Sequence, residues 1–331
     1  LIIVIIFLKL FILIMVIFMV VRLGYVSIAK SIYDDNSFKT ITYTNYSKNS
    51  DIKRIDEIIL NNLDTLYKII CFNIKNNIHF YRITSALIPL ATLSSVCFDY
   101  ISKYDFLYKK IGSVIKLNGM RVDMHPSEYA VLNSTNKAVV NNTFEILRYH
   151  VDVLKALGVK PYIILHVGSN AFGKKNSLSR FINNFNLLSD DIKNSIVIEN
   201  DDKVFNVDDV LYLSRVLKCP FVFDYLHHIC NPCDKDITYY LKDIFDTWGD
   251  VTPKVHFSSS KSKLKKDMRS HADYINVYGF IDFIELIKPY TERVDIMIEA
   301  KMKDEAMFRL IRQLRFVSNY TFIDDTTFIV K

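Results

Sequence analysis

Residues 161–167 read PYIILHV and residues 195–201 read SIVIEND, and this pair of segments decides the fold. Each is a short run of Ile, Leu and Val that ends in polar or charged side chains, as expected for a buried strand. A longer amphipathic segment at 176–188 lies between them and has the spacing of a helix. The unit is therefore predicted to be a strand, a helix and a second strand.

The same alternation continues along most of the chain. Further strands are expected at 20–27, 78–84, 120–125, 220–225, 253–258 and 294–300. Further helices are expected near 54–76, 99–116, 140–157, 206–217, 236–247, 272–288 and 303–317. About eight such repeats predict a single-domain (β/α)8 TIM barrel, in the α/β fold class. The polar stretch 34–50 is expected to be a loop, and 319–331 is ambiguous between a strand and a tail.

The composition is that of a globular protein with a large core. Of the 331 residues, 50% are hydrophobic and 24% are charged, which excludes a disordered chain. The net charge of +6 permits a nucleic acid as partner without requiring one. The five cysteines are scattered and odd in number, so we expect no disulfide framework and a cytoplasmic location.

The segment 1–21 is apolar except for Lys9 and is long enough to cross a bilayer. It runs without a polar linker into the strand expected at 20–27, and the same residues cannot form both a spanning helix and a core strand. We therefore interpret residues 1–18 as upstream read-through, with translation starting at Met19 and the barrel domain occupying 19–331. The alternative is a protein anchored in the membrane by this segment.

Most of the expected strands end in a side chain that binds metals or transfers protons. These side chains are His125, His166, Glu199, Asp224 with His227, His256 and Glu299, and His271 follows the seventh strand. In a barrel the carboxyl ends of all strands meet on one face, where barrel enzymes keep their active sites. We therefore expect one cluster. A lone histidine is usually structural, which is our interpretation of His79 and His150 but does not explain so regular a set.

The mixture of imidazoles and carboxylates indicates the kind of metal. It suits Mn2+, Zn2+ or Fe2+ better than Mg2+ or Ca2+, which prefer oxygen ligands. The set is too large for one tetrahedral zinc ion, so two or three ions are expected. Neighbouring ions of this kind activate water and neutralise charge on a phosphate, so the pattern favours phosphodiester hydrolysis.

Short motifs distributed after residue 21 carry a resemblance to a known family. They are Arg22-Leu-Gly-Tyr25, Phe80-Tyr-Arg-Ile83, His125-Pro126, Leu165-His166-Val-Gly168, Arg180-Phe181, Glu199-Asn-Asp-Asp202, Phe223-Asp-Tyr-Leu-His-His228, Lys254-Val-His256, His271-Ala-Asp273 and Glu299-Ala-Lys-Met-Lys303. In these motifs the chain resembles the UV damage endonucleases, manganese-dependent barrel enzymes of DNA repair. The resemblance implies hydrolysis of the phosphodiester bond immediately 5′ to UV photolesions, both pyrimidine dimers and 6-4 photoproducts. The ends left would be a 3′-hydroxyl and a 5′-phosphate.

The resemblance also implies a centre of three metal ions. Its ligands would be His125, His166, Glu199, Asp224, His227, His256, His271 and Glu299. The expected cofactor is Mn2+, with Zn2+ or Mg2+ as alternatives and no organic cofactor. Glu199, His256 and Lys254 would be catalytic. The family often carboxylates this lysine, which is physically sensible because an ammonium group is unfavourable among metal cations.

Two aromatic side chains are implied to probe the lesion. The family pushes a Gln-Tyr pair into the duplex as a wedge, and here the pair is Glu128-Tyr129. Tyr129 keeps the stacking ring, whereas an ionised Glu128 only accepts hydrogen bonds and repels phosphate. Tyr25 matches a second probing aromatic, although Ala29 stands where the family often has Asn.

Lysines in two expected loops at the mouth of the barrel indicate a DNA-binding face. They are Lys174 and Lys175 after the fourth strand, and Lys261, Lys263, Lys265 and Lys266 after the seventh. A run of charges is usually a solvated surface, but lysines beside a phosphodiester site bind backbone phosphates. We therefore interpret these lysines as DNA contacts.

Other functions are compatible with a metal-binding barrel. The nearest are an abasic-site endonuclease of the endonuclease IV type and a metal-dependent sugar isomerase similar to xylose isomerase. A third is a DNA-binding module without catalytic activity. The aromatic and basic loops favour a polymeric substrate over an enclosed sugar, and a complete set of ligands argues against an inactive module. We expect a monomer that acts on damaged double-stranded DNA.

Overall fold

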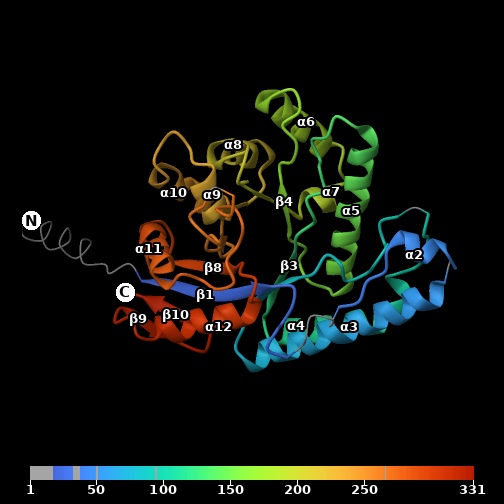
Figure 1. The fold of residues 1–331 in the computed structure, drawn as a ribbon, viewed down its shortest axis with the longest axis horizontal. Coiled ribbons are helices and arrows are strands. Elements are labelled where there is room, and N and C mark those ends of the chain that lie inside the picture. The colour runs from blue at the N-terminus through green and yellow to red at the C-terminus, as the bar shows by residue number, and fades with distance from the viewer. Residues whose placement is uncertain (1–17, 33–37, 50, 94, 265) are drawn as a thin grey trace, which may run out of the picture.

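The computed structural model describes residues 18–331 except 33–37, 50, 94 and 265. Its centre is a closed barrel of parallel strands in the order β2-β3-β4-β5-β6-β7-β8-β1, with β1 paired to β2 to complete the ring. The strands are β1 (Met19–Val26), β2 (Phe80–Ile83), β3 (Arg121–Met124), β4 (Ile163–His166), β5 (Ile196–Glu199), β6 (Phe221–Asp224), β7 (Lys254–Phe257) and β8 (Arg293–Ile298). Helices surround the barrel (Figure 1). The predicted (β/α)8 barrel is confirmed.

One main helix follows each strand of the barrel. These helices are α3 (Ile52–Lys75), α4 (Asp105–Leu117), α5 (Lys137–Ala156), α6 (Lys174–Asn186), α8 (Val207–Leu217), α10 (Thr238–Asp246), α11 (Val277–Ile287) and α12 (Lys303–Leu314). Shorter pieces are α2 (Tyr43–Ser47), α7 (Asp190–Lys193), α9 (Tyr225–Cys230), η1 (Ser102–Tyr104) and η2 (Lys288–Tyr290). The prediction of a loop across 34–50 is wrong for α2, which begins after Thr42, whose side chain accepts a hydrogen bond from the Asn45 amide at 3.3 Å.

The last residues of the chain form a hairpin beside the barrel. Its strands are β9 (Tyr320–Phe322) and β10 (Thr327–Val330), and β10 pairs antiparallel with β1, with Met19 opposite Val330. Figure 1 shows the hairpin next to β1 and α12. The ambiguous segment 319–331 is therefore an edge extension of the sheet.

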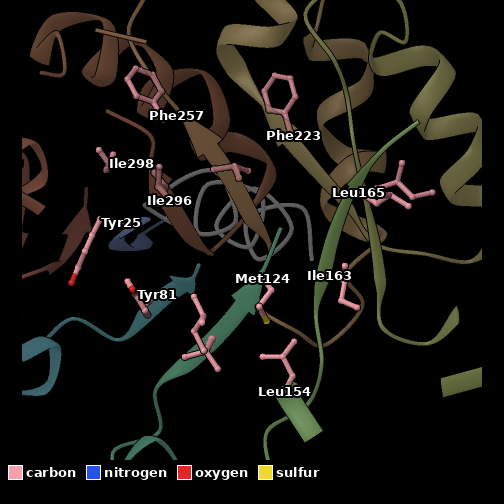
Figure 2. Close-up of a cluster of buried hydrophobic side chains, with 14 of the residues drawn as sticks. Tyr25, Tyr81, Met124, Leu154, Ile163, Leu165, Phe223, Phe257, Ile296 and Ile298 are labelled. Atoms are coloured by element: carbon pink, nitrogen blue, oxygen red, sulfur yellow. The ribbon is translucent and has the colours of Figure 1, made fainter. Parts of the chain in front are cut away.

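Side chains alternate between the two faces of each strand, which separates the core from the site. On β4, Ile163 and Leu165 point away from the barrel axis and pack with helix residues such as Leu154 (Figure 2). Ile164 and His166 consequently point into the barrel. The same period places polar residues two positions apart, such as Lys254 and His256, on the inner face.

A group of charges lies at the amino ends of the strands, opposite the polar strand ends. The buried Asp295 accepts hydrogen bonds from Arg22 Nε and Nη2, at 2.6 and 2.8 Å, and from Arg121 Nη1 at 2.9 Å. Two guanidinium groups therefore satisfy this buried carboxylate. Each of the three residues comes from a different strand, so the ion pairs join β1, β3 and β8 at this end of the barrel.

The apolar segment at the start of the chain was interpreted above as read-through or as a membrane anchor. Its residues 1–17 lie outside the described part of the chain. Within the described part of the chain, none of the helices has the length and apolar composition needed to span a membrane.

Candidate active site

The polar ends of the strands converge inside the mouth of the barrel. Strand pairing sets His166 directly beside Glu199, which is buried at the centre of the cluster. Glu199 Oε2 lies 3.0 Å from His125 Nε2 and 3.6 Å from His166 Nε2. Glu199 Oε1 lies 2.7 Å from His256 Nδ1 and 3.6 Å from His227 Nδ1. Four imidazoles from different elements thus surround one carboxylate.

The remaining predicted ligands extend this cluster. Asp224 Oδ2 lies 3.7 Å from His227 Nδ1 and 3.9 Å from His256 Nδ1. Glu299 Oε1 lies 3.4 Å from His256 Nδ1, and its Oε2 lies 4.0 Å from His271 Nδ1. The structure therefore brings all eight predicted ligand residues into one connected set.

Two groups of ligand atoms in the cluster could each hold a metal ion. One is formed by His125, His166 and Glu199 and the other by Glu199, Asp224 and His256, with the atoms of each group within 4.8 Å of one another. Asp224 Oδ2 and His166 Nδ1 are buried and have no hydrogen-bond partner among the described residues. An unsatisfied buried polar atom is costly, and a cation would satisfy the carboxylate oxygen. The residues therefore fit a metal centre.

The electrostatics of the cluster also favour a bound cation. Burial, together with the neighbouring Glu199 and Glu299 carboxylates, raises the pKa of Asp224 to about 7. Burial lowers the pKa of His256 to about 4 and also lowers the pKa of His166, so both imidazoles are neutral at pH 7 and keep a lone pair. Positive charge among these carboxylates would relieve their repulsion and keep Asp224 ionised.

Arg82 belongs to the cluster, although the sequence did not identify it as a site residue. It is buried on β2, its Nη1 donates to Glu299 Oε1 at 2.5 Å, and its Nη2 contacts His256 Nε2. The guanidinium offsets part of the carboxylate charge and fixes Glu299. Two signals in the sequence pointed to it: a lone cation in an otherwise apolar strand, and its place in the Phe80-Tyr-Arg-Ile83 motif.

Lys254 lies one layer below the cluster, two residues before His256 on β7. Its ammonium group donates to Asp123 on β3, and Arg82 Nε lies 3.5 Å from the other carboxylate oxygen. Burial lowers the pKa of Lys254 to about 8, although the Asp123 carboxylate acts to raise it. A carboxylated Lys254 would place two anions side by side here. The unmodified ammonium group, by contrast, pairs with the Asp123 carboxylate.

The predicted wedge residues lie at the rim of the cluster. The Tyr129 side chain is 73% exposed, and Glu128 beside it is also exposed. A groove of about 390 Å³ is lined by Glu128 and its neighbours in the loop after β3, by 201–204, and by His166 and His227 of the cluster. The groove therefore joins the wedge loop to the predicted metal ligands.

The structure does not support the prediction that Tyr25 probes DNA. Its side chain is fully buried, its hydroxyl donates to Asn73 Oδ1 at 2.7 Å, and its ring lies 5.2 Å from that of Tyr81 (Figure 2). The strand period explains the difference. Arg22 and Gly24 point into the barrel, so Tyr25 points outward into the layer covered by α3.

The predicted DNA-binding lysines differ in their surroundings. Lys174 is the first residue of α6 and not part of a loop, and its Nζ lies 2.6 Å from Asp209 Oδ2. Lys261 Nζ lies 4.0 Å from Asp267 Oδ1. The remaining described lysines of the prediction are exposed, namely Lys175, Lys263 and Lys266. Lys265 lies outside the described residues.

Several known proteins resemble this chain over most of its length. A family model described as UV-endonuclease UvdE matches residues 21–327. A UV DNA damage endonuclease from Bacillus cereus is 37% identical over 316 residues, which cover 93% of this chain and 99% of that protein. One from Bacillus thuringiensis has the same identity and coverage. The crystal structure of SacUVDE superposes with a TM-score of 0.81 at 35% identity, covering 89% of this chain and 98% of that one.

More distant solved structures share the fold alone. Endonuclease IV from Thermus thermophilus gives a TM-score of 0.55 at 14% identity, covering 88% of this chain and 98% of that one. A 3-keto-D-glucoside 4-epimerase from E. coli gives 0.54 at 10% identity, covering 89% and 99%. Proteins with this barrel fold thus catalyse unrelated reactions, so the fold alone does not indicate the activity.

Proposed function

This chain belongs to the UV-endonuclease UvdE family, and from that premise we propose that it is a metal-dependent endonuclease of DNA repair that cuts damaged double-stranded DNA immediately 5′ to UV photolesions. The observation that supports this most is the set of four imidazoles around Glu199, next to the unpartnered Asp224 Oδ2. Such a set suits a divalent cation and has no evident purpose without one.

The donor set favours Mn2+, in two or three ions, with Zn2+ or Mg2+ as alternatives. The ligands would be His125, His166, Glu199, Asp224, His227, His256, His271 and Glu299. When bound, such ions supply the positive charge that activates water and stabilises the charge developing on a phosphate.

The chain's own residues prepare this chemistry. Arg82 holds the Glu299 carboxylate, and Glu199 orients the imidazoles that hydrogen-bond to it. Because these side chains are buried and fixed by one another, the site needs little rearrangement before reaction. Hydrolysis at this site would leave a 3′-hydroxyl and a 5′-phosphate.

The rim of the barrel provides the contacts with DNA. Exposed lysines such as Lys175 and Lys263 attract backbone phosphates in a salt-dependent manner. The exposed ring of Tyr129 replaces stacking that is lost where the duplex is distorted, so a damaged site, whose stacking is already weakened, is the easier one to open.

The proposal is tested with the purified protein, Mn2+ and an end-labelled duplex that contains one thymine dimer. Undamaged and abasic duplexes are run beside it, with and without chelator. The expected result is one chelator-sensitive cut immediately 5′ to the dimer and no cut in undamaged DNA. Cutting at the abasic site alone would instead indicate an endonuclease of the endonuclease IV type. No cutting with any divalent metal would contradict both nuclease activities.

A further inference from the structure

Phe172 is an exposed aromatic residue at the mouth of the barrel whose role no family motif explains. Its side chain is 79% exposed, and it lies in the loop between β4 and α6, three residues before the exposed Lys175. Its φ of 64° is in the left-handed region, which a bulky side chain rarely adopts. Such a conformation is strained and persists only where the surroundings hold it in place.

Several hydrogen bonds hold this loop. The side chain of Asn176 donates to the Phe172 carbonyl at 2.8 Å. Arg180 Nη2 donates to the Ala171 carbonyl at 2.5 Å, and Ser177 Oγ donates to the same carbonyl at 3.2 Å. The backbone is thus fixed on both sides of a side chain that points into solvent. The backbone that carries this apolar ring is therefore already ordered for contact with a partner.

Further hydrogen bonds, one of them again from Arg180, join this loop to the loop that carries Tyr129. The buried Asn133 donates to the Ser169 carbonyl at 2.7 Å and accepts from the Ser169 amide at 2.7 Å. Arg180 Nε donates to the Asn133 carbonyl at 2.9 Å, and Asn184 donates to the Leu132 carbonyl at 2.7 Å. The two loops are therefore fixed to one another and to α6.

The close approach of the two loops depends on Gly168. A Cβ atom at this position would lie 2.8 Å from Asn133 Oδ1 and 2.9 Å from Val131 Cγ1. The backbone φ of Gly168 is 105°, a value that residues with a side chain rarely adopt. Both loops also contribute to the groove that leads to the metal-ligand cluster, through Val131 on one side and Gly168 on the other. The loops that carry the exposed rings of Tyr129 and Phe172 are therefore connected to one another, and both line that groove.

We propose that Phe172 is a second DNA-contacting aromatic, which stacks on a nucleobase displaced from the damaged duplex while Tyr129 acts as the wedge. This inference rests on the proposed function. Phe172 would then be the second probing aromatic, because Tyr25 is buried in this structure and cannot contact DNA. An exposed ring three residues from Lys175 offers the combination that unstacked nucleic acid favours, with a π-face for the base and a cation for the phosphate.

The test uses the full chain and four variants, Phe172→Ala, Phe172→Trp, Phe172→Leu and the control Phe316→Ala. Phe316 is 91% exposed and follows the carboxyl end of α12, at the opposite end of the barrel. Dissociation constants are measured by fluorescence anisotropy, in chelator, for duplexes with and without one thymine dimer. Each series is repeated at several salt concentrations, and thermal unfolding is recorded for every variant.

Phe172→Ala is expected to weaken binding of the dimer duplex by about 5- to 150-fold, the range that loss of one base stack gives. Phe172→Trp should restore binding and Phe172→Leu should not, because stacking needs a π-face. The salt slope should not change, since no phosphate contact is lost. Phe316→Ala should bind as the wild type does, and the unfolding temperatures should agree.

Three results would overturn the inference. In the first, Phe172→Ala binds the dimer duplex as the wild type does. In the second, Phe172→Leu binds as well as Phe172→Trp, which indicates a general apolar contact. In the third, the wild type itself does not distinguish damaged from undamaged DNA, and then the proposed function fails as well. The first two results leave the proposed function standing.

Discussion

Lys254 and Asp123 form an ion pair inside the barrel, where each side chain is 1% exposed. Arg82 Nε lies 3.5 Å from the second oxygen of Asp123, and Arg82 Nη1 donates a hydrogen bond to Glu299 Oε1. A continuous set of charges therefore runs from the Lys254 layer up to the predicted metal ligands. Desolvation of a buried pair is offset only when both partners are present.

Asp123→Asn is expected to destabilise the protein by about 3–5 kcal/mol, because it leaves Lys254 without its buried counter-charge and Arg82 with Glu299 as its remaining ion-pair partner. Urea unfolding at pH 7 measures the change. The double variant Asp123→Asn with Lys254→Met should recover part of the loss, because the uncompensated cation is then absent. Equal stability of the single variant and the wild type would contradict the role given to this pair.

The barrel and its ligand cluster could be predicted because both follow from local periods in the sequence. A short apolar strand that ends in His166 or Glu199 fixes the position of that side chain along the barrel axis. The strand order of a barrel then brings the ends together without any knowledge of individual contacts. The hairpin of β9 and β10 has no such repeat and depends on pairing with β1, about 300 residues earlier in the chain.

Arg82 and Tyr25 could not be placed because their partners are distant in sequence. Arg82 is 217 residues from Glu299 and 174 residues from His256. Tyr25 is 48 residues from Asn73, and only the packing of α3 on the barrel shows that its hydroxyl has a buried partner. A motif preserves the residue type, but the direction of a side chain at the end of a strand is decided by the strand register.

Glu199→Gln is expected to reduce nicking of dimer-containing DNA by more than about 100-fold. Loss of a residue that only supports a metal ligand reduces activity by about 10- to 100-fold, and loss of a ligand itself should cost more. Glu199 belongs to both groups of candidate ligand atoms, so its loss should also lower the bound Mn2+ measured by elemental analysis. The matched control is Glu145→Gln, which removes an exposed carboxylate from α5. Full metal content in Glu199→Gln would argue against a central ligand role.

The buried His150 on α5 predicts a loss of stability in acid. Its Nδ1 lies 2.6 Å from the Ile146 carbonyl and its Nε2 lies 3.0 Å from Ser85 Oγ. Burial lowers its pKa to about 4, below the value of 6.5 for an unperturbed imidazole. Between these values the unfolded chain binds a proton that the folded chain does not. Stability therefore falls as the pH falls from 6.5 toward 4.

This residue should contribute a loss of roughly 2 kcal/mol between pH 7 and pH 5. His150→Gln removes the titrating ring, so its unfolding free energy should decrease less over the same interval, whatever its stability at pH 7. Urea unfolding of both proteins at the two pH values measures the difference. The same decrease in both proteins would show that His150 does not carry this pH dependence.

Tyr129→Ala separates recognition of the lesion from assembly of the metal site. The ring is 73% exposed at the rim, so its removal disturbs neither the core nor the eight candidate ligands. Loss of a stacking contact worth about 1–3 kcal/mol should lower the ratio of nicking at the dimer duplex to nicking of undamaged DNA by about 5- to 150-fold. Tyr212→Ala, which removes a half-exposed ring from α8, should leave this ratio unchanged. The bound Mn2+ should equal that of the wild type. A parallel loss of metal would mean that Tyr129 supports the cluster instead of acting as a wedge.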